Sequence, residues 1–534
     1  MPQLTRQAGG FTIQMPSRTA VPTPTVHDGR LYASGGFSST EFYCFNAETG
    51  DLVWGVDLSD DGPSSGVVSE GTVVCGTESC TLFAMEAATG KMRWSHYLGD
   101  PLLSTPTIDG GRVFIVYPWR AQIAAIEAPD EKVGETNSKG GGKLLDAPGD
   151  RAVSSSHVLA CFDLKTGDVA WQKYIDTDCM SAPVAGGNQL YLVTLSGTMY
   201  CFNQADGRIE SALRLNATSA PVVAGGEIFL TRRADKDGRI AEAMFTCDRA
   251  TYTVKALGDA REAPYLDQTV QRNSAATAEA NAFEQQNAIG GGFGGGFGGG
   301  FGKDGPDDGL FSVPAEGIQS EDKDAAEGDA TEPSSPNEAS HAASGPGEAQ
   351  SDADDPLADD TPAPGEADGE PADLLAETQQ LAADTIGLGN VSTLQMFQGS
   401  RILHRGRRNF NCMGDVLICR SAQTGKQIWS QPLDGDLKKM GGHLAAPPIA
   451  AGGSLFLATL EGKVHQIDPR TGRILRSHKV DGQLRFSPIV EGGRIYVTTQ
   501  DGKLVCIDTK DRSLTGWPTW GKNAAHTNVD DGRR

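Results

Sequence analysis

Residues 24–54 read PTVHDGRLYASGGFSSTEFYCFNAETGDLVW, and degenerate copies of this segment run along the chain. Seven further copies begin at Gly66, Pro106, Pro183, Pro221, near Gln395, and at Pro448 and Pro488. Where no insertion intervenes, the copies are spaced by 38 to 42 residues. A fixed spacing near 40 residues, built from short strands, is typical of a β-propeller or a related array.

Each copy predicts four short strands. The first begins at the proline and ends at a two-residue turn such as Asp28-Gly29, where glycine supplies the positive φ of a tight hairpin. The fourth ends, in the clearest copies, at a tryptophan such as Trp54. One such unit cannot bury both of its faces, whereas eight units in a closed ring can. We therefore predict an all-β fold, an eight-bladed β-propeller of four-stranded antiparallel blades.

A shared signature closes the clearest copies. It reads CFNAETGDLVW, AMEAATGKMRW, CFDLKTGDVAW and CRSAQTGKQIW at residues 44–54, 84–94, 161–171 and 419–429. Together with GWPTWGKNAAHTN near the end of the chain, it resembles the pyrroloquinoline-quinone-like (PQQ-like) repeat of the quinoprotein alcohol dehydrogenase-like superfamily. The resemblance covers roughly residues 20–258 and 395–527.

The resemblance implies how neighbouring blades dock. In that family the tryptophan and the turn glycine of the signature dock adjacent blades. Here these residues are Trp54, Trp94, Trp171 and Trp429, with Gly50, Gly90, Gly167 and Gly425. The other four copies have Ser211, Ala256, Arg476 and Gly516 at the tryptophan position, so we expect half of the docking ring to be remodelled.

The repeats and the stretches between them define the expected domain organisation. We expect an N-terminal segment with a possible closure strand (1–22), blades 1–5 (23–258) with an insertion at about 117–155 in blade 3, a long insertion (259–393), blades 6–8 (394–527) and a C-terminal tail (528–534). Residues 11–15 (FTIQM) are the candidate closure strand, and the sequence does not place them.

The long insertion also explains the acidic composition. The chain has a net charge of −23, and residues 303–393 alone hold 23 acidic residues and two lysines, a net charge of −21. The rest is close to neutral and offers no basic footprint for nucleic acid. The insertion is glycine-rich and then acidic, with too few apolar residues to fold, so we predict disorder. Residues 371–386 can form a short amphipathic helix, either docked or transient.

Ten cysteines raise the question of redox or metal chemistry. Five of them share one repeat position: Cys44, Cys161, Cys201, Cys419 and Cys506. Ala84 and Thr246 occupy that position in other copies, which indicates a small-residue packing position between blades. Cys75 and Cys80 flank a turn and are candidates for a disulfide only if the protein is exported.

The rest of the sequence offers only weak matches to known phosphate-binding, calcium-binding or catalytic motifs. Residues 297–303 (FGGGFGK) lack the first glycine and the Ser/Thr of a phosphate-binding loop. Residues 235–238 (DKDG) resemble the start of a calcium loop but lack its third ligand position and its distal glutamate. Quinoprotein dehydrogenases of this fold carry an adjacent cysteine pair, a calcium site and a catalytic aspartate, and none maps onto this sequence. We predict a non-catalytic scaffold without cofactor or metal; the alternative is a PQQ- and calcium-dependent dehydrogenase or a degenerate descendant of one.

Insertions gather on one expected face of the ring, the face of the second-to-third-strand and blade-to-blade loops. They include a long loop expected at 404–415. The candidate partner-binding rim on this face consists of Trp119, Arg120, Arg232, Arg233, Arg405, Arg407 and Arg408. These arginines either bind carboxylates of a protein or peptide partner, or of the acidic insertion, or simply balance nearby acids.

The sequence leaves the compartment open. No apolar run is long enough to span a membrane as a helix, and residues 1–15 lack the apolar core of a signal peptide. The protein is expected in the cytoplasm if this N-terminus is complete, and in the periplasm or cell envelope if a signal peptide is missing. We expect a monomeric ring.

Overall fold

The computed structural model describes the chain in separate stretches. They are residues 1–37, 39–77, 81–98, 104–118, 143–144, 157–263, 266, 310–311, 400–437, 440, 443–517 and 520–530. All of them belong to one compact unit, formed by Met1–Ser312 and Glu366–Arg534. Apart from residues 259–263, 266 and 310–311, the insertion predicted to be disordered lies outside the described residues. So do the helix predicted at 371–386, Cys80 of the possible disulfide, and Trp119 and Arg120 of the predicted rim.

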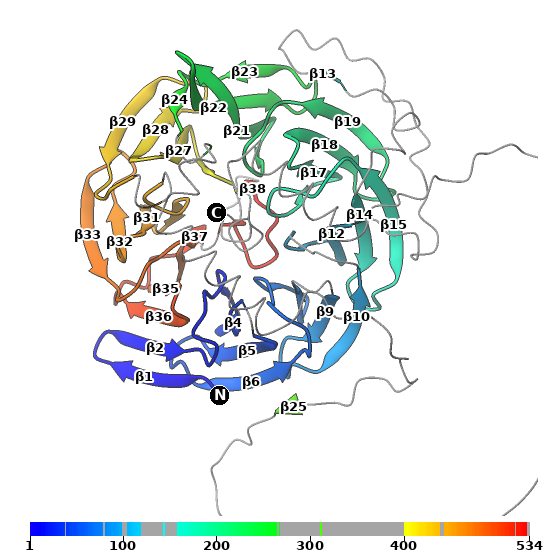
Figure 1. The fold of residues 1–534 in the computed structure, drawn as a ribbon, viewed down its shortest axis with the longest axis vertical. Coiled ribbons are helices and arrows are strands. Elements are labelled where there is room, and N and C mark those ends of the chain that lie inside the picture. The colour runs from blue at the N-terminus through cyan, green and yellow to red at the C-terminus, as the bar shows by residue number, and fades with distance from the viewer. Residues whose placement is uncertain are drawn as a thin grey trace, which may run out of the picture. The chain divides into compact units, whose positions relative to one another are not determined.

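Eight sheets, each built on four antiparallel strands, surround a common axis, which confirms the predicted eight-bladed propeller (Figure 1). The strands of blades 1 to 4 are, from the axis outwards, β3 (Thr25–His27), β4 (Arg30–Ser34), β5 (Glu41–Asn46) and β6 (Leu52–Asp57); β7 (Val67–Ser69), β8 (Thr72–Gly76), β9 (Thr81–Glu86) and β10 (Met92–Tyr97); β11 (Thr107–Asp109), β12 (Arg112–Pro118), β14 (His157–Asp163) and β15 (Val169–Ile175); and β16 (Val184–Gly186), β17 (Gln189–Val193), β18 (Thr198–Asn203) and β19 (Ile209–Arg214).

Blades 5 to 8 follow the same order. Their strands are β20 (Val222–Ala224), β21 (Glu227–Lys236), β22 (Arg239–Asp248) and β23 (Val254–Ala256), with β24 (Arg261–Glu262) also on β22; β26 (Ile402–Arg405), β27 (Arg408–Met413), β28 (Val416–Ser421) and β29 (Gln427–Pro432); β30 (Ile449–Ala451), β31 (Ser454–Thr459), β32 (Lys463–Ile467) and β33 (Ile474–Lys479); and β34 (Ile489–Glu491), β35 (Arg494–Thr498), β36 (Lys503–Asp508) and β2 (Gly10–Gln14). The long insertion therefore separates blades 5 and 6, as predicted.

Five short strands extend these sheets. β1 (Gln3–Gln7), β13 (Lys143–Leu144) and β25 (Leu310–Phe311) add to the outer edges of blades 8, 4 and 1. β37 (Gly516–Trp517) and β38 (Val529–Asp530) add to the innermost strands of blades 7 and 5. Both insertions thus contribute a strand to the outside of a blade.

The N-terminus closes the ring. β2 supplies the fourth strand of blade 8, pairing antiparallel with β36 near the other end of the chain, and Phe11 lies opposite Cys506. In blade 1 the same position opposite Cys44 is held by Trp54, so Phe11 takes the place of the tryptophan. The sequence assignment of Gly516 to that place was wrong, because Gly516 lies in β37 and pairs with blade 7.

The shared cysteine position is buried between blades. Cys44, Cys161, Cys201, Cys419 and Cys506 are at most 1% exposed, and all are free thiols. Burial raises the pKa of Cys44 and Cys419 to about 11, so these thiols stay protonated at neutral pH. The structure thus gives these residues a packing environment rather than a reactive one.

Aromatic side chains of outer strands contact the following blade at its last turn. A Cβ atom at Gly90 would lie 2.7 Å from Cε3 of Trp54, so only glycine admits the indole there. The Trp54 indole N–H also donates to the Ala87 carbonyl at 3.2 Å. Equivalent contacts join Trp94 to Gly167, Trp171 to Gly207, Trp429 to Gly472 and Phe11 to Gly50. Gly425 differs, because it faces the backbone of Leu257 and Gly258.

A second recurring contact was not predicted. An arginine at the start of the second strand reaches turn carbonyls of the next blade in three seams: Arg30 to Ala88 (3.2 Å), Arg112 to Gln204 (2.6 Å) and Arg408 to Pro469 (2.8 Å). In a fourth seam Arg494 pairs with Glu48. The blades are therefore joined by apolar packing and by charged donors to backbone oxygens.

We propose that the tryptophan contacts carry much of the stability of the ring, and Trp171 tests this. Trp171→Ala should lower the free energy of unfolding by about 3–5 kcal/mol, because it removes a large buried side chain. Trp171→Phe keeps part of the packing and loses the 3.0 Å bond to the Gln204 carbonyl, and should cost less.

The free energies are measured by denaturant unfolding. Val169→Ala, on the same strand and 48% exposed in the wild type, is the matched control and should change stability by less than about 0.5 kcal/mol. Equal losses for Trp171→Ala and Val169→Ala would contradict the proposed role.

Candidate functional site

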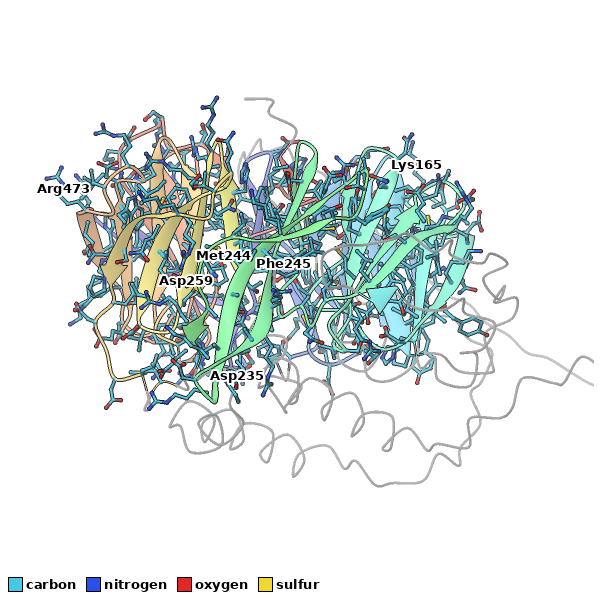
Figure 2. All side chains as sticks on the ribbon, turned by 90° about the horizontal axis from the view of Figure 1, so that it is seen from above. Lys165, Asp235, Met244, Phe245, Asp259 and Arg473 are labelled. Atoms are coloured by element: carbon cyan, nitrogen blue, oxygen red, sulfur yellow. The ribbon has the colours of Figure 1, made fainter. Side chains whose placement is uncertain are left out.

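The ring has two distinct faces. The first-to-second and third-to-fourth turns of each blade lie together, as shown by the 2.9 Å bonds from Ala47 N to Gly29 O and from Ala422 N to Arg407 O. We call this side the short-turn face and the opposite side, which carries the second-to-third-strand loops, the insertion face. In Figure 2 Lys165 and Arg473 mark the short-turn face, and Asp235 marks the insertion face.

The structure does not bring the arginines of the predicted rim together. Arg405, Arg407 and Arg408 lie at the tight β26–β27 hairpin, on the short-turn face. The predicted long loop at 404–415 was wrong, because these residues form the end of β26, all of β27 and two tight turns. Arg232 and Arg233 lie in β21, nearer the insertion face.

A row of four polar residues sets blade 6 apart from every other blade. His404, Asn409, Arg420 and Gln427 lie opposite one another across its four strands, on the side that faces blade 5. In the other seven blades the equivalent row contains only apolar residues or glycine. In blade 4, for example, the row is Ala185, Leu190, Phe202 and Ile209.

The polar row is buried in the seam between blades 5 and 6. Asn409 is fully buried, Arg420 is 6% exposed and His404 is 7% exposed. His404 shares a 2.7 Å hydrogen bond between Nδ1 and the Asn409 Oδ1, and its ring stacks on Phe229 of blade 5 with 4.5 Å between centroids. Burying polar groups in this way costs free energy unless they are paired.

Arg420 holds the strand end from which the long insertion departs. Its guanidinium donates to the Gly425 carbonyl at 3.0 Å and to the Asp259 carbonyl of blade 5 at 3.3 Å. Burial lowers the pKa of Arg420, with a smaller opposing effect from Asp259. In this seam Lys255, and not Ala256 as the sequence suggested, occupies the tryptophan position, opposite Thr246. Lys255 Nζ donates to the Gln423 carbonyl at 2.8 Å.

The polar character continues towards the axis. Glu242 is fully buried in blade 5, and its carboxylate accepts a 2.6 Å hydrogen bond from the Thr218 hydroxyl. The same carboxylate lies 3.8 Å from Nη1 of Arg401, the residue immediately before blade 6. The side-chain amide of Asn411 is also fully buried, and neither its nitrogen nor its oxygen has a hydrogen-bond partner among the described residues. Such an unsatisfied amide is rare in a folded protein and suggests a site for water or ligand.

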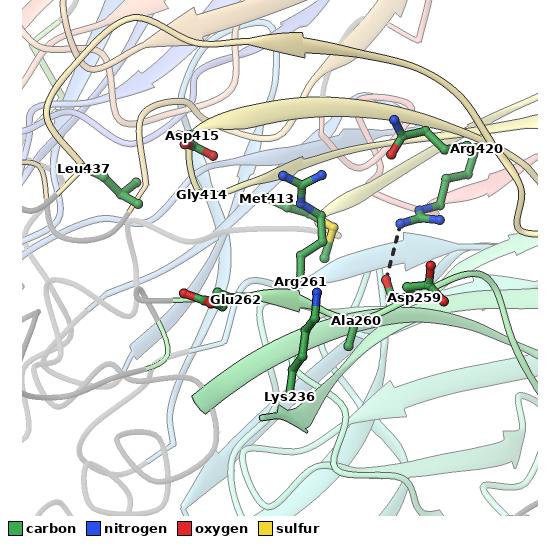
Figure 3. A pocket seen from close by; sticks show the side chains of 11 residues that line it. Lys236, Asp259, Ala260, Arg261, Glu262, Met413, Gly414, Asp415, Arg420 and Leu437 are labelled. Atoms are coloured by element: carbon green, nitrogen blue, oxygen red, sulfur yellow. Dashed lines mark hydrogen bonds between the residues drawn. The ribbon is translucent and has the colours of Figure 1, made fainter. Parts of the chain in front are cut away.

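A cavity of about 510 Å³ opens in the outer part of this seam (Figure 3). Three cations and three carboxylates line it: Lys236, Arg261, Arg420, Asp259, Glu262 and Asp415. Figure 3 shows Lys236 and Arg261 extending from blade 5 towards Met413 of blade 6. The volume lies within the range of ligand sites, and the mixed charge suits a polar peptide segment better than an apolar molecule.

The C-terminal segment occupies the centre of the ring (Figure 1). Its backbone carbonyls at Ala524 and Ala525 accept hydrogen bonds of 2.7 and 3.0 Å from Val68 of blade 2 and Ile108 of blade 3. Asn528 Nδ2 donates to the Pro221 carbonyl of blade 5 at 2.7 Å. This segment, residues 520–530, therefore bridges three blades across the axis.

The occupied centre of the ring does not fit a flat quinone cofactor. A flat cofactor on the ring axis would compete with residues 520–530, which bond to the inner strands there. Within the described stretches, no group of three or more His, Cys, Asp or Glu side chains is arranged to hold a metal ion.

Among the residues that the structure describes, no helix has the length and apolar composition required to cross a membrane.

Sequence reasoning missed the polar row, although the repeats contain a signal for it. The residue after the shared cysteine position is Phe45, Phe162 or Phe202 in blades 1, 3 and 4, whereas blade 6 has Arg420 in CRSAQTG. Aligning the copies column by column would have singled out this arginine. His404 in β26 and Asn409 in β27 could not be recognised as part of the row, because both fall within the loop predicted at 404–415.

Comparisons with known proteins give one consistent result. Residues 38–237 and 412–527, more than half of the chain, match the sequence model of a family described as outer membrane protein assembly factor BamB. BamB of Moranella endobia is 22% identical over 244 residues, which cover 40% of this chain and 62% of that protein. BamB of Bordetella pertussis is 24% identical over 217 residues, covering 37% and 55%. The chain thus spans less than two thirds of the length of these curated relatives.

A solved structure, BamB from Moraxella catarrhalis, aligns with a TM-score of 0.48 at 12% identity. The alignment covers 94% of this chain and 97% of that chain.

Two buried histidines predict acid sensitivity. Burial lowers the pKa of His157 and His526 from 6.5 to about 3. The unfolded chain therefore binds protons between pH 6.5 and 3 that the folded chain does not, so this stability is present above pH 6.5 and is lost as the pH falls. At pH 5 each histidine should remove about 2 kcal/mol relative to neutral pH.

Denaturant unfolding at pH 7.5 and pH 5 measures this loss. His526→Gln should reduce the difference between the two free energies by about 2 kcal/mol, whatever its effect at pH 7.5. A variant with the wild-type difference would show that His526 is not protonated on unfolding in this range.

Reconstitution tests the disagreement with a quinone site. Purified protein supplied with PQQ and calcium should show no change in cofactor absorbance and no turnover of alcohols or sugars with a dye acceptor. The control is the same assay with PQQ and calcium but no protein. Turnover above this control would contradict the structural argument.

Proposed function

The chain belongs to the family described as outer membrane protein assembly factor BamB, and from this premise we propose that it is a non-catalytic scaffold that binds protein partners in the cell envelope. The proposed scaffold acts as a monomeric ring and needs no cofactor. Its partner site is the seam between blades 5 and 6, on the insertion face. A partner from the machinery that assembles outer-membrane proteins fits the description of the family.

The polar row of blade 6 is the observation that carries this proposal. An apolar row would pack this seam, as it packs the seven others, and would avoid burying Arg420 and Asn409. Residues that lower stability and cluster beside a cavity are typical of binding sites. We infer that the row holds the cavity open and fixes the strand ends that line it.

The proposed contact surface differs from the predicted rim. Arg232 and Arg233 remain in it, together with Lys236 and Arg261, since all four lie in blade 5 towards the insertion face. Arg405, Arg407 and Arg408 lie at the opposite face and are left out. The Arg232 guanidinium lies over the Phe245 ring, with its Cζ 5.6 Å from the ring centroid. A partner segment with carboxylates suits these cations.

The acidic insertion is proposed to regulate access. Blade 5 ends at Glu262 beside the cavity, and blade 6 begins at Ile402, so the insertion is tethered at the seam itself. A tethered segment with a net charge of −21 would act at a high effective concentration near the cations. It would compete with an acidic partner and weaken its binding.

Site-specific crosslinking tests the proposed surface. A photo-crosslinking residue placed at Lys236 should capture an envelope protein in the native host, which mass spectrometry then identifies. The same residue at Lys165, on the short-turn face, is the matched control and should not capture that protein. Equal capture from both positions would contradict the assignment.

Deleting residues 264–399 tests the regulatory part against the partner so identified. The deletion should increase the affinity at low salt at least several-fold and make it more sensitive to salt, because the competing carboxylates are gone. Titrations of the purified partner at 50 and 300 mM salt measure both effects. Unchanged affinity at both salt concentrations would overturn the regulatory role of the insertion, but it would not contradict the proposed contact surface on blade 5.

A further inference from the structure

The outer edge of blade 7 differs from those of blades 4 and 8, whereas blade 5, which also lacks the tryptophan, has β24 on β22 beside its outer strand β23. Blades 4 and 8 lack the docking tryptophan, and each carries an extra outer strand, β13 on β19 and β1 on β2. Blade 7 also lacks the tryptophan, with Arg476 opposite Gln466 at that position. Among the described residues, however, no strand pairs with the outer side of β33. The outer edge of blade 7 therefore has neither a docking tryptophan nor, among the described residues, an extra outer strand like those of blades 4 and 8.

β33 is exposed along nearly its whole length. Its sequence is ILRSHK, and five of its six residues are exposed. Ile474 and Leu475 are 37% and 46% exposed, which is unusual for consecutive branched apolar residues in a sheet. An open, partly apolar edge strand offers unpaired backbone N–H and C=O groups as a template for another strand.

The same edge is strongly basic. Arg473 precedes the strand, and Arg476 and Lys479 lie within it; no ion pair to any of the three occurs among the described residues. Lys479 lies directly opposite Lys463 of β32, whose own charge is paired with Glu461 at 3.0 Å and Asp434 at 3.6 Å. Figure 2 shows Arg473 at the periphery of the ring. A strand bearing carboxylates would pair with the cations of this edge.

We propose that β33 is a docking edge for an extended, acidic strand of a partner protein. The incoming strand would pair its backbone with β33, combine acidic with apolar residues, and cover part of the exposed apolar surface of Ile474 and Leu475. The chain itself uses this mode at three other outer edges, through β1, β13 and β25. Main-chain pairing gives affinity in such complexes, and side chains give specificity. This surface is separate from the blade 5–6 seam and does not depend on its proposed function.

The test uses the full-length protein and a fluorescein-labelled peptide of four Glu-Val repeats. Fluorescence anisotropy should show saturable binding that exceeds the binding of four Lys-Val repeats by at least tenfold. Methylating alternate peptide nitrogens removes the backbone donors and should abolish binding. Equal binding of the methylated peptide would show simple charge attraction and would overturn strand addition, and so would failure of the Glu-Val peptide to bind.

Variants and hydrogen exchange locate the site. Arg473→Glu combined with Arg476→Glu should weaken binding at least tenfold, whereas Lys91→Glu combined with Lys165→Glu, on blades 2 and 3, should change it less than twofold. Both variants should melt within a few degrees of the wild type. The peptide should slow amide exchange at residues 474–479. Protection, in the free chain, of the β33 amides that point away from β32 would overturn the proposal, because the edge would then be covered by the chain itself.

Discussion

The contact between a large outer-strand side chain and a turn glycine of the next blade is the interaction on which the ring depends. Gly90 shows why both partners are needed. Its φ of 76° suits glycine, and a Cβ there would lie 2.7 Å from the Trp54 ring. The indole then bonds to a carbonyl of the same turn. Repeated around the axis, this contact sets the spacing of the blades, and Phe11 extends it across the junction of the two chain ends.

The seams after blades 4, 5 and 7 lack this interaction, and in the seam between blades 5 and 6 buried polar contacts replace it. Lys255 occupies the tryptophan position, Gly425 meets backbone, and Arg420 joins the blades through carbonyl oxygens. Buried charged and polar groups contribute no more to the free energy of folding than apolar packing would at such a site, since the cost of their desolvation offsets much of their attraction. Their presence beside a cavity, at the point where the long insertion is tethered, argues for binding.

Much of the ring could be predicted from the sequence, because each blade repeats the same local signals. The period, the Asp28-Gly29 type of turn and the Cys-to-Trp spacing determined eight blades and the packing role of cysteines such as Cys44. Closure by β2 could not be placed, because the pairing of Phe11 with Cys506 joins residues from opposite ends of the chain. The 404–415 hairpin was missed because its strand, RNFNCM, is polar on the side that other blades make apolar.

The arginines of the predicted rim do not share one face of the ring, and the sequence could not show this for a related reason. Sequence patterns place residues on strands or loops, but they do not show which loops share a face until the hairpins are correctly assigned. Once β27 is recognised as a strand, Arg405 and Arg407 move to the short-turn face, and Lys236 and Arg261 emerge as the cations beside the cavity.

The central claim is that the polar row of blade 6 is retained for binding rather than for stability. It is tested most directly by replacing the row with that of blade 4: His404→Ala, Asn409→Leu, Arg420→Phe and Gln427→Ile in one variant. The measurement pairs the free energy of unfolding with crosslinked capture of the partner from position 236. The account predicts unchanged or higher stability together with loss of capture. A variant that is equally stable and captures the partner as well as the wild type would contradict it.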